Sequence, residues 1–318
     1  MTSRRIVSML PSASEIVCLC GGEAELVGRS HEDDYPESIR HLPIVTRSTT
    51  VFTSSADVER QVMEALNTGK GMYTVEAETL LGLKPTAIVT QDLCHVCAID
   101  LQTVERVAHK IDPIPHIITL NPLKFQDVIE DILRVGTELG YAEGAQRAVD
   151  ALNVRISSAT KRANELLSSA GNGVRPRVLF IEWTDPVYPG GHWTPQLVHM
   201  AGGTQTIPGY PVATDIIGAG PSVVVTHEAC VESDPEVIVI SPCGVNLEGA
   251  VKEADLIRDT PWFQQILKKG GVRVAVVDGN QMFNRPGPRL VDALEFLVGF
   301  VWDKESLIPA GFPYVKYV

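Results

Sequence analysis

The sequence lacks several features that would assign it at once to a class of protein. No apolar stretch reaches the roughly 18 residues that a membrane-spanning helix needs, and no run of Lys and Arg is longer than a pair. The net charge of −12, from 27 basic and 39 acidic residues, disfavours binding to nucleic acid or to an anionic membrane surface. Six cysteines in 318 residues are too few for a disulfide scaffold.

Common catalytic motifs are missing as well. The chain contains no G-x-S-x-G elbow, no P-loop and no G-x-G-x-x-G. What is present is the composition of a folded globular protein, with 44% hydrophobic and 21% charged residues. A chain of this length usually forms two domains or one large α/β domain. We therefore expect a large core that needs no disulfides, and no catalytic class is indicated.

The first 20 residues resemble an export leader only superficially. Pro11 and Glu15 interrupt the apolar run that follows two arginines, and a secretory signal needs an unbroken run. We expect instead a buried strand over residues 5–10 and a helix over residues 12–19, with Ser12 as its N-cap and Glu15 completing a capping box. The expected location is the cytoplasm, or the periplasm if a leader precedes this sequence.

The two halves of the chain follow one plan. The segments RRIVSMLPSASEIVCLCGG and RPRVLFIEWTDPVYPGGHWTPQLVHMAGG each read as a strand, a polar turn, a helix and a terminating Gly-Gly. The segments LKPTAIVTQDLC and SDPEVIVISPCG each place a proline before an apolar strand that ends at a cysteine. Continuous apolar runs of this kind are typical of strands that are buried on both faces of a parallel sheet.

This duplication predicts an α/β fold of two Rossmann-like lobes with parallel sheets, joined by one long rigid α-helix, with the ligand cleft between the lobes. Residues 143–170 contain no Pro or Gly from residue 145 onward and predict one helix of about 26 residues. A continuous helix is stiffer than a Gly/Ser linker. The expected domains are residues 1–141, the helix 142–173, and residues 174–318.

Polar and aromatic residues follow the predicted strands in both halves. Open parallel sheets bind ligands beyond the carboxyl ends of their strands, so we expect these residues to line the cleft. The candidate ligand-binding residues of the first half are Ser12, His31, Glu32, Asp33, Tyr35, Gln91, Asp92, Cys94 and Cys97. Those of the second half are Glu182, Trp183, His192, Trp193, Pro242, Cys243, Asn280, Phe283 and Arg285.

The cysteines and histidines among these candidates allow two interpretations. Cys94 and Cys97 have the CxxC spacing of zinc and redox sites. Together with Cys243, and with His31 or His192, they would complete a thiolate and imidazole set for zinc or iron. The alternative is packing, since buried free thiols are common.

The other candidates also have structural alternatives. The acidic turn that begins at His31 could be a solvated turn, as exposed carboxylates usually are. Trp183, Trp193 and Phe283 are either core residues or a flat apolar face for a ligand. Arg285 is the residue of its turn whose charge could face an anionic ligand.

Taken together, these motifs resemble the helical-backbone metal receptor superfamily, the cobalamin- and iron-siderophore-binding proteins of ABC importers. RIVSMLPSASEIVCLCGG is similar to that family's first strand and helix, and PTAIVTQDLCHVC and PEVIVISPCG are similar to its repeated strand. The loops SHEDDYP, TQDLCHVC, EWTDP, GHW, SPCG and DGNQMFNRPGPRLVD resemble a cobalamin-binding subgroup. The similarity spans residues 4 to about 302.

The resemblance implies non-catalytic binding of a small molecule, a corrinoid such as cobalamin or a related metal chelate, between lobes that move little. It also implies an ABC permease as partner, which would dock on an acidic residue of each lobe. The acidic residues near the matching segments are Glu76, Glu78, Glu228 and Glu232.

Two other hypotheses stay open from the residues alone. In the first, the Cys and His candidates bind a zinc or iron ion directly. In the second, the protein is a thiol-dependent or corrinoid-processing enzyme that uses Cys94 or Cys243 as a thiolate, for which a lowered thiol pKa would be the signature.

Overall fold

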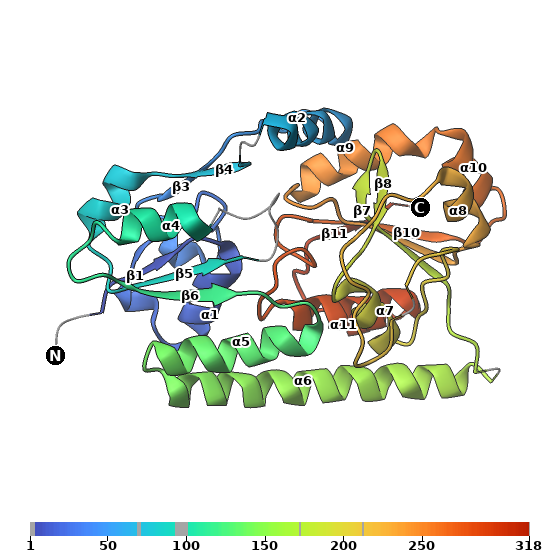
Figure 1. Ribbon diagram of the computed structural model, residues 1–318. Coiled ribbons are helices and arrows are strands. Elements are labelled where there is room, and N and C mark those ends of the chain that lie inside the picture. Colours follow the sequence, from blue (N-terminus) through green and yellow to red (C-terminus); the bar gives the residue numbers. More distant parts are fainter. Residues whose placement is uncertain (1–3, 69–70, 93–100, 172, 212, 318) are drawn as a thin grey trace. The chain divides into compact units, whose positions relative to one another are not determined.

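The computed structural model describes residues 4–68, 71–92, 101–171, 173–211 and 213–317, and the chain divides into two compact units (Figure 1). Unit 1 comprises Met1–Thr53, Asp57–Pro122 and Asp127–Ala151; unit 2 comprises Ser54–Ala56, Leu123–Gln126 and Leu152–Val318. The division falls inside the long helix α6 (Ala142–Ser169) rather than at its ends. Two short segments from the first half of the chain belong to unit 2.

The sheet of unit 1 is entirely parallel, as expected. Its strands are β2 (Leu26–Gly28), β1 (Ile6–Ser8), β5 (Ala87–Gln91) and β6 (His116–Leu120), in that spatial order. Short apolar runs put β-branched side chains on both faces of β1 and β5, and these side chains are fully buried. A separate antiparallel pair joins β3 (Thr46–Ser48) to β4 (Tyr73–Val75).

The other regular elements of the first half of the chain are helices. They are α1 (Pro11–Cys20), α2 (Ser55–Thr68), α3 (Ala77–Leu83), α4 (Leu101–Ala108) and α5 (Phe125–Glu138), with 3-10 turns at Glu23–Glu25 and Glu37–Ile39. The amphipathic pattern read from the sequence is confirmed in α5, where Phe125, Val128, Ile132 and Val135 recur at helical spacing and are buried.

The sheet of unit 2 has the expected parallel strands at its centre and an antiparallel strand, which was not expected, at each edge. Its order is β11 (Tyr314–Lys316), β10 (Arg273–Val277), β9 (Val237–Ile240), β7 (Val178–Thr184) and β8 (Val187–Pro189). The central three strands are parallel, whereas the edge strands β8 and β11 are antiparallel. Only two residues separate β7 from β8, and a connection this short allows a hairpin but no parallel crossover.

The remaining elements of unit 2 are helices that alternate with these strands. They are α7 (Thr194–Met200), α8 (His227–Glu232), α9 (Leu247–Arg258), α10 (Pro261–Leu267) and α11 (Leu290–Val301), with a 3-10 turn at Glu305–Leu307. Among the described residues, no helix combines the length and the apolar character that a membrane span requires.

The duplication read from the sequence is confirmed in the strand order. β1, β5 and β6 lie side by side in unit 1 (Figure 1). β7, β9 and β10 lie side by side in the same sequence order in unit 2. The expected glycine ends are present too. Gly21 after α1 and Gly202 after α7 have φ values of 97° and 83°, the left-handed conformation that ends helices.

The expected capping box at the first helix is wrong. The helix begins at Pro11 with Leu10 as its N-cap, and no side chain caps it. Proline suits the first helical position because its φ is fixed and it has no N–H to leave unsatisfied. Ser12 therefore lies inside the first turn, buried, and its hydroxyl has no hydrogen-bond partner among the described residues.

The long helix expected near the middle of the chain is confirmed. α6 has 28 residues and begins at Ala142, so it includes Gly144, which precedes the Gly-free stretch read from the sequence. A Cβ atom at Gly144 would lie 2.0 Å from the carbonyl oxygen of Cys20. Glycine is therefore required there by the close approach of two helices within unit 1, and it does not interrupt the helix.

Candidate functional site

The site candidates of unit 1 follow the carboxyl ends of its parallel strands. The first turn of α1, with Ser12, comes after β1, the turn with His31 comes after β2, and Gln91 ends β5. Because these strands are parallel, the three positions lie at one edge of the sheet. The backbone N–H of Asp92 donates to the side-chain oxygen of Asn121, which follows β6, at 2.8 Å. Cys94 and Cys97 lie outside the described residues.

Asp33 is a buried structural residue at this edge. Its side chain is 1% exposed, and its two carboxylate oxygens accept hydrogen bonds from the hydroxyls of Ser14 and Ser30. Burial raises the pKa of Asp33, and these hydrogen bonds oppose the rise. Arg29 donates to the Asp33 carbonyl oxygen at 3.0 Å. Asp33 thus fixes the turn after β2 to α1.

His31 presents an imidazole with one nitrogen bonded and the other without a partner. Its Nδ1 lies 2.7 Å from the hydroxyl oxygen of Thr46, which also accepts the backbone N–H of His31 at 3.0 Å. Its Nε2 is buried and has no hydrogen-bond partner among the described residues; the carboxylate of Glu32 lies 3.9 Å away. Burial lowers the pKa of His31, so the neutral, metal-competent form is favoured.

Tyr73 was not recognised from the sequence, although it completes this cluster. Its ring centroid lies 5.4 Å from that of His31, and its hydroxyl donates to Glu32 at 3.3 Å. It comes from β4, which is 42 positions away in the chain, and only the tertiary structure brings it here. Tyr35 on the same turn is 46% exposed. An imidazole, a phenol and a carboxylate therefore gather at one edge of unit 1.

The corresponding edge of unit 2 contains Glu182 near the end of β7. Its carboxylate accepts hydrogen bonds from the backbone N–H of Gly191 at 3.1 Å and from the Ser222 hydroxyl at 3.0 Å. Burial raises the pKa of Glu182, against the effect of these two donors. Trp183 beside it is half-buried against the core of the unit. Ser222 was not recognised from the sequence.

Two of the expected ligand-facing aromatics lie in the interior of unit 2. Trp193 is 6% exposed and its indole N–H donates to the carbonyl oxygen of Phe283 at 2.7 Å. Phe283 is 1% exposed and packs edge-on against Phe180, with ring centroids 4.8 Å apart. Their burial favours packing over direct contact with a ligand.

His192 lies in the turn after β8 and is held by its backbone. Its N–H donates to the Gly220 carbonyl at 2.5 Å, and its carbonyl accepts from the Ala219 N–H at 2.9 Å. Its ring stacks on Trp193 at 5.5 Å, and its buried Nδ1 has no partner among the described residues. Burial lowers the pKa of His192.

The loops after β9 and β10 hold each other at the same edge. The side-chain amide of Asn284 donates to the carbonyl oxygens of Ser241 and Gly279, at 3.1 and 2.9 Å. The carboxylate of Asp278 accepts the backbone N–H groups of Leu247 and Gln281, at 3.2 and 2.8 Å. The sequence candidates in these loops are Pro242, Cys243, Asn280 and Arg285. Of these, Cys243 is an exposed thiol and Arg285 is buried.

A direct metal-ion site is not formed by the part of the chain that the structure describes. Within those ranges, no group of three or more His, Cys, Asp or Glu side chains is placed to hold an ion. The set expected from the sequence, Cys94, Cys97 and Cys243 with His31 or His192, depends on two residues outside those ranges and stays a prediction.

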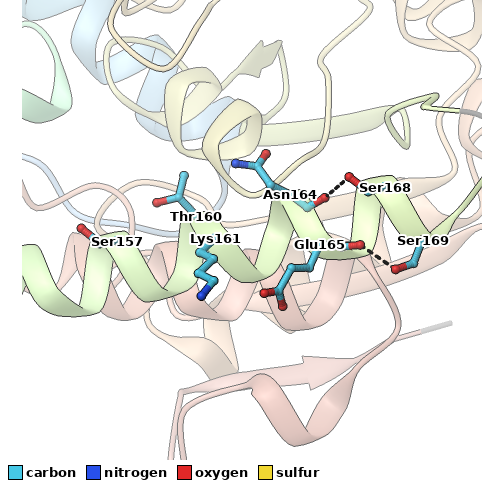
Figure 2. Close-up of a pocket in the computed structure, with 7 residues that line it drawn as sticks. All are labelled: Ser157, Thr160, Lys161, Asn164, Glu165, Ser168 and Ser169. Carbon is cyan, nitrogen blue, oxygen red and sulfur yellow. Dashed lines mark hydrogen bonds between the residues drawn. The ribbon is translucent and has the colours of Figure 1, made fainter.

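Two surface hollows in unit 2 lie away from these edges. The larger, of about 720 Å³, lies along α6 and is lined by seven residues of that one helix (Figure 2). Ser168 and Ser169 donate to backbone carbonyls one turn earlier, so their hydroxyls are already engaged. The second, of about 420 Å³, lies between α8 and α10 and is lined by His227, Glu228, Val231, Glu232, Pro261, Trp262 and Gln265.

The sequence matches the family model for periplasmic binding proteins over residues 6–267, and the chain belongs to that family. The structure is similar to the apo form of the periplasmic heme-binding protein RhuT from Roseiflexus sp. RS-1, with a TM-score of 0.65, 21% identity, and 95% of this chain and 99% of that chain covered. These findings confirm the resemblance inferred from the sequence motifs.

Two further solved structures share the fold. A periplasmic heme-binding protein from Pseudomonas aeruginosa has a TM-score of 0.67 and 20% identity, with 98% of this chain and 94% of that chain covered. The periplasmic vitamin B12-binding protein BtuF of Vibrio cholerae has a TM-score of 0.63 and 19% identity, with 95% of this chain and 98% of that chain covered. No curated protein shows a significant match. All three structures are described as periplasmic, so the expected cytoplasmic location gains no support from them.

Proposed function

We propose that the protein binds a planar metal chelate, a corrinoid of the cobalamin type or a related macrocycle, and that it does so without catalysing a reaction. The family is one of binding proteins, and solved structures with the same fold bind heme or vitamin B12. Whether one ligand contacts the site edges of both units stays a prediction.

The observation that carries the proposal is the buried, unpartnered Nε2 of His31 among the described residues. A neutral imidazole can donate a lone pair to cobalt or iron. In the tautomer whose Nδ1–H donates to the Thr46 hydroxyl, Nε2 carries that lone pair. The protonated imidazole cannot ligate a metal, and burial disfavours that form. Tyr73 beside it supplies an aromatic face, which suits contact with a macrocycle.

Titration of the full chain with ligands that have an exchangeable axial position tests the proposal. Aquocobalamin and haemin both change their visible absorbance when an imidazole binds the metal. We expect such a change in the wild-type protein, and a loss of affinity of at least tenfold, about 1.4 kcal/mol, in the His31→Ala variant. No spectral change and no heat at high micromolar concentrations of either ligand would contradict the proposal.

The matched control is His109→Ala. His109 belongs to the same unit and is exposed. Its ring forms a hydrogen bond with the carbonyl oxygen of Glu105 at 2.7 Å. Its removal should leave the affinity unchanged. An equal loss in both variants would show that the effect of His31 is not specific.

An ABC permease is the partner that this function implies, and we propose that acidic side chains of α8 take part in docking. Glu228 and Glu232 line the hollow beside Trp262, whereas Glu76 already pairs with Arg47 at 2.8 Å. Reversing both charges, Glu228→Lys with Glu232→Lys, should abolish stimulation of a reconstituted permease and leave ligand affinity intact. Unchanged stimulation would exclude α8 as the docking element.

A further inference from the structure

The hollow between α8 and α10 of unit 2 combines an aromatic stack with two carboxylates. The ring of His227 lies over the ring of Trp262, with the centroids 5.1 Å apart and an angle of 13° between the planes. Trp262 is 6% exposed and packs edge-on against Phe263 at 5.3 Å, which fixes the surface on which the imidazole rests. Glu228 and Glu232 line the same hollow. The stack therefore holds a titratable ring beside two acidic side chains.

The two carboxylates face solvent without a cation of their own. In the described part of the chain, no Lys or Arg forms an ion pair with Glu228 or Glu232, whereas Asp234, shortly after them, pairs with Lys269. Both glutamates are exposed and lie one helical turn apart, where like charges repel each other. Charge complementarity therefore selects a partner surface that brings a basic side chain to this hollow.

His227 is placed to change the charge of the hollow. The pKa of Glu228 lies below its ordinary value, first because its own backbone N–H donates to it, then because of the Thr226 hydroxyl, and also through the charge of His227. The imidazole is thus close enough to act on this carboxylate. The lining residues from α10 are neutral: Pro261, Trp262 and Gln265. Protonation of His227 therefore cancels one of the two negative charges that line the hollow.

We propose that His227 makes docking at this hollow dependent on pH, because a basic side chain of the partner meets two negative charges when the imidazole is neutral and a net charge of one when it is protonated. This inference rests on the docking through α8 proposed above. An imidazole changes its charge between about pH 5 and 8, where carboxylates stay ionised. Cation–π attraction to the indole face holds the imidazolium in the hollow. Docking is therefore weaker on the acid side of this range.

A tri-arginine peptide is the probe that tests this dependence. It is titrated into the full chain at about pH 7.5 and about pH 5.5, and the NMR shift of the Trp262 indole reports binding. Because exposed charge pairs contribute modestly, we expect the dissociation constant to be about threefold higher at the lower pH. The uncharged tri-citrulline peptide should not bind. His227→Gln should bind tri-arginine equally at both pH values, and His41→Gln, a change at an exposed histidine of unit 1, should keep the dependence of wild type.

The outcomes separate the role of His227 from the docking proposal. Equal affinity of wild type at the two pH values, or an unchanged pH dependence in His227→Gln, would overturn the role of His227. If Glu228→Gln with Glu232→Gln binds tri-arginine as tightly as wild type, the hollow takes no basic group and docking through α8 fails as well. If the reconstituted permease requires both glutamates but responds to wild type and to His227→Gln alike at the two pH values, docking stands and only the role of His227 fails.

Discussion

The hydroxyl of Ser222 donates a hydrogen bond of 3.0 Å to the carboxylate of Glu182, and this contact ties a loop without regular structure to the end of a central strand. We expect Ser222→Ala to lower the free energy of unfolding by about 1.5–3 kcal/mol, because hydrogen bonds to charged groups contribute about that much to stability. Urea unfolding measures the effect. A free energy of unfolding equal to that of wild type would show that the loop is held without this contact.

Ligand binding through His31 should persist at mildly acid pH. The neutral imidazole is the ligating form, and burial lowers the pKa of His31 below its ordinary value of 6.5. Affinity for aquocobalamin should therefore remain constant as the pH falls through 6.5 and decline only at more acid pH. A titration series from about pH 8 to 4.5 measures this. Half-loss of affinity at or above pH 6.5 would contradict the assignment.

Asp33 should make the protein less stable as the pH rises from acid toward neutral. Because its pKa is raised on folding, the native state holds this proton more tightly than the unfolded state. Above the pKa of about 3.9 that Asp33 has in the unfolded chain, the unfolded state loses the proton while the native state keeps it. The unfolding free energy therefore falls as the pH rises, until the pH passes the pKa of Asp33 in the native state. The Asp33→Asn variant lacks this proton. Urea unfolding of both proteins across this range should show the difference, and parallel curves would contradict the account.

Trp193 should affect stability more than ligand binding. Trp193→Phe keeps one aromatic ring, but the Phe283 carbonyl loses the indole N–H that donates to it at 2.7 Å. A buried acceptor left unsatisfied costs about 1–3 kcal/mol. Trp302→Phe is the control. The indole N–H of Trp302 donates to the Ala201 carbonyl at 2.8 Å in a partly buried hydrogen bond, so its loss should lower the free energy of unfolding by less. A change in ligand affinity without a change in unfolding free energy would place Trp193 in the site after all.

The buried carboxylate of Glu253 on α9 should contribute to the folding stability of unit 2. It accepts the hydroxyl of Thr184 at 2.6 Å, and both the backbone N–H and the hydroxyl of Ser55, the first residue of α2. Glu253→Ala removes the acceptor of the Ser55 N–H and hydroxyl and leaves the Thr184 hydroxyl only its 2.8 Å contact with the Ser55 hydroxyl. It should lower the unfolding free energy by about 2–4 kcal/mol. Glu248→Ala, an exposed change on the same helix, should stay within about 0.5 kcal/mol. Equal effects of the two variants would refute this role.

The sequence predicts those parts of the fold that local patterns determine. The apolar runs of β5 and β9, the glycine ends of α1 and α7, and the uninterrupted helical stretch of α6 each carry their signal within a short segment. The antiparallel edge strand β8 was missed because its three residues look like part of a polar turn. The role of Gly144 was missed because the close approach of Cys20 is a long-range contact.

The site was harder to predict than the fold for the same reason. Strand ends indicated where His31 and Glu182 lie, but no local pattern shows that Tyr73 and Ser222 join them. Nor does composition tell whether an aromatic residue in a loop faces the ligand or the core. The burial of Phe283 depends on its contact with Phe180, about 100 positions away.

Native mass spectrometry of the protein taken directly from its host tests the central claim most directly. The account predicts a complex of one chain with a metal chelate, whose mass and visible absorbance identify a porphyrin or a corrinoid, and predicts that the His31→Ala variant is isolated largely without it. A co-purifying molecule that contains no metal, or a metal ion bound without any organic chelate, would contradict the proposed function.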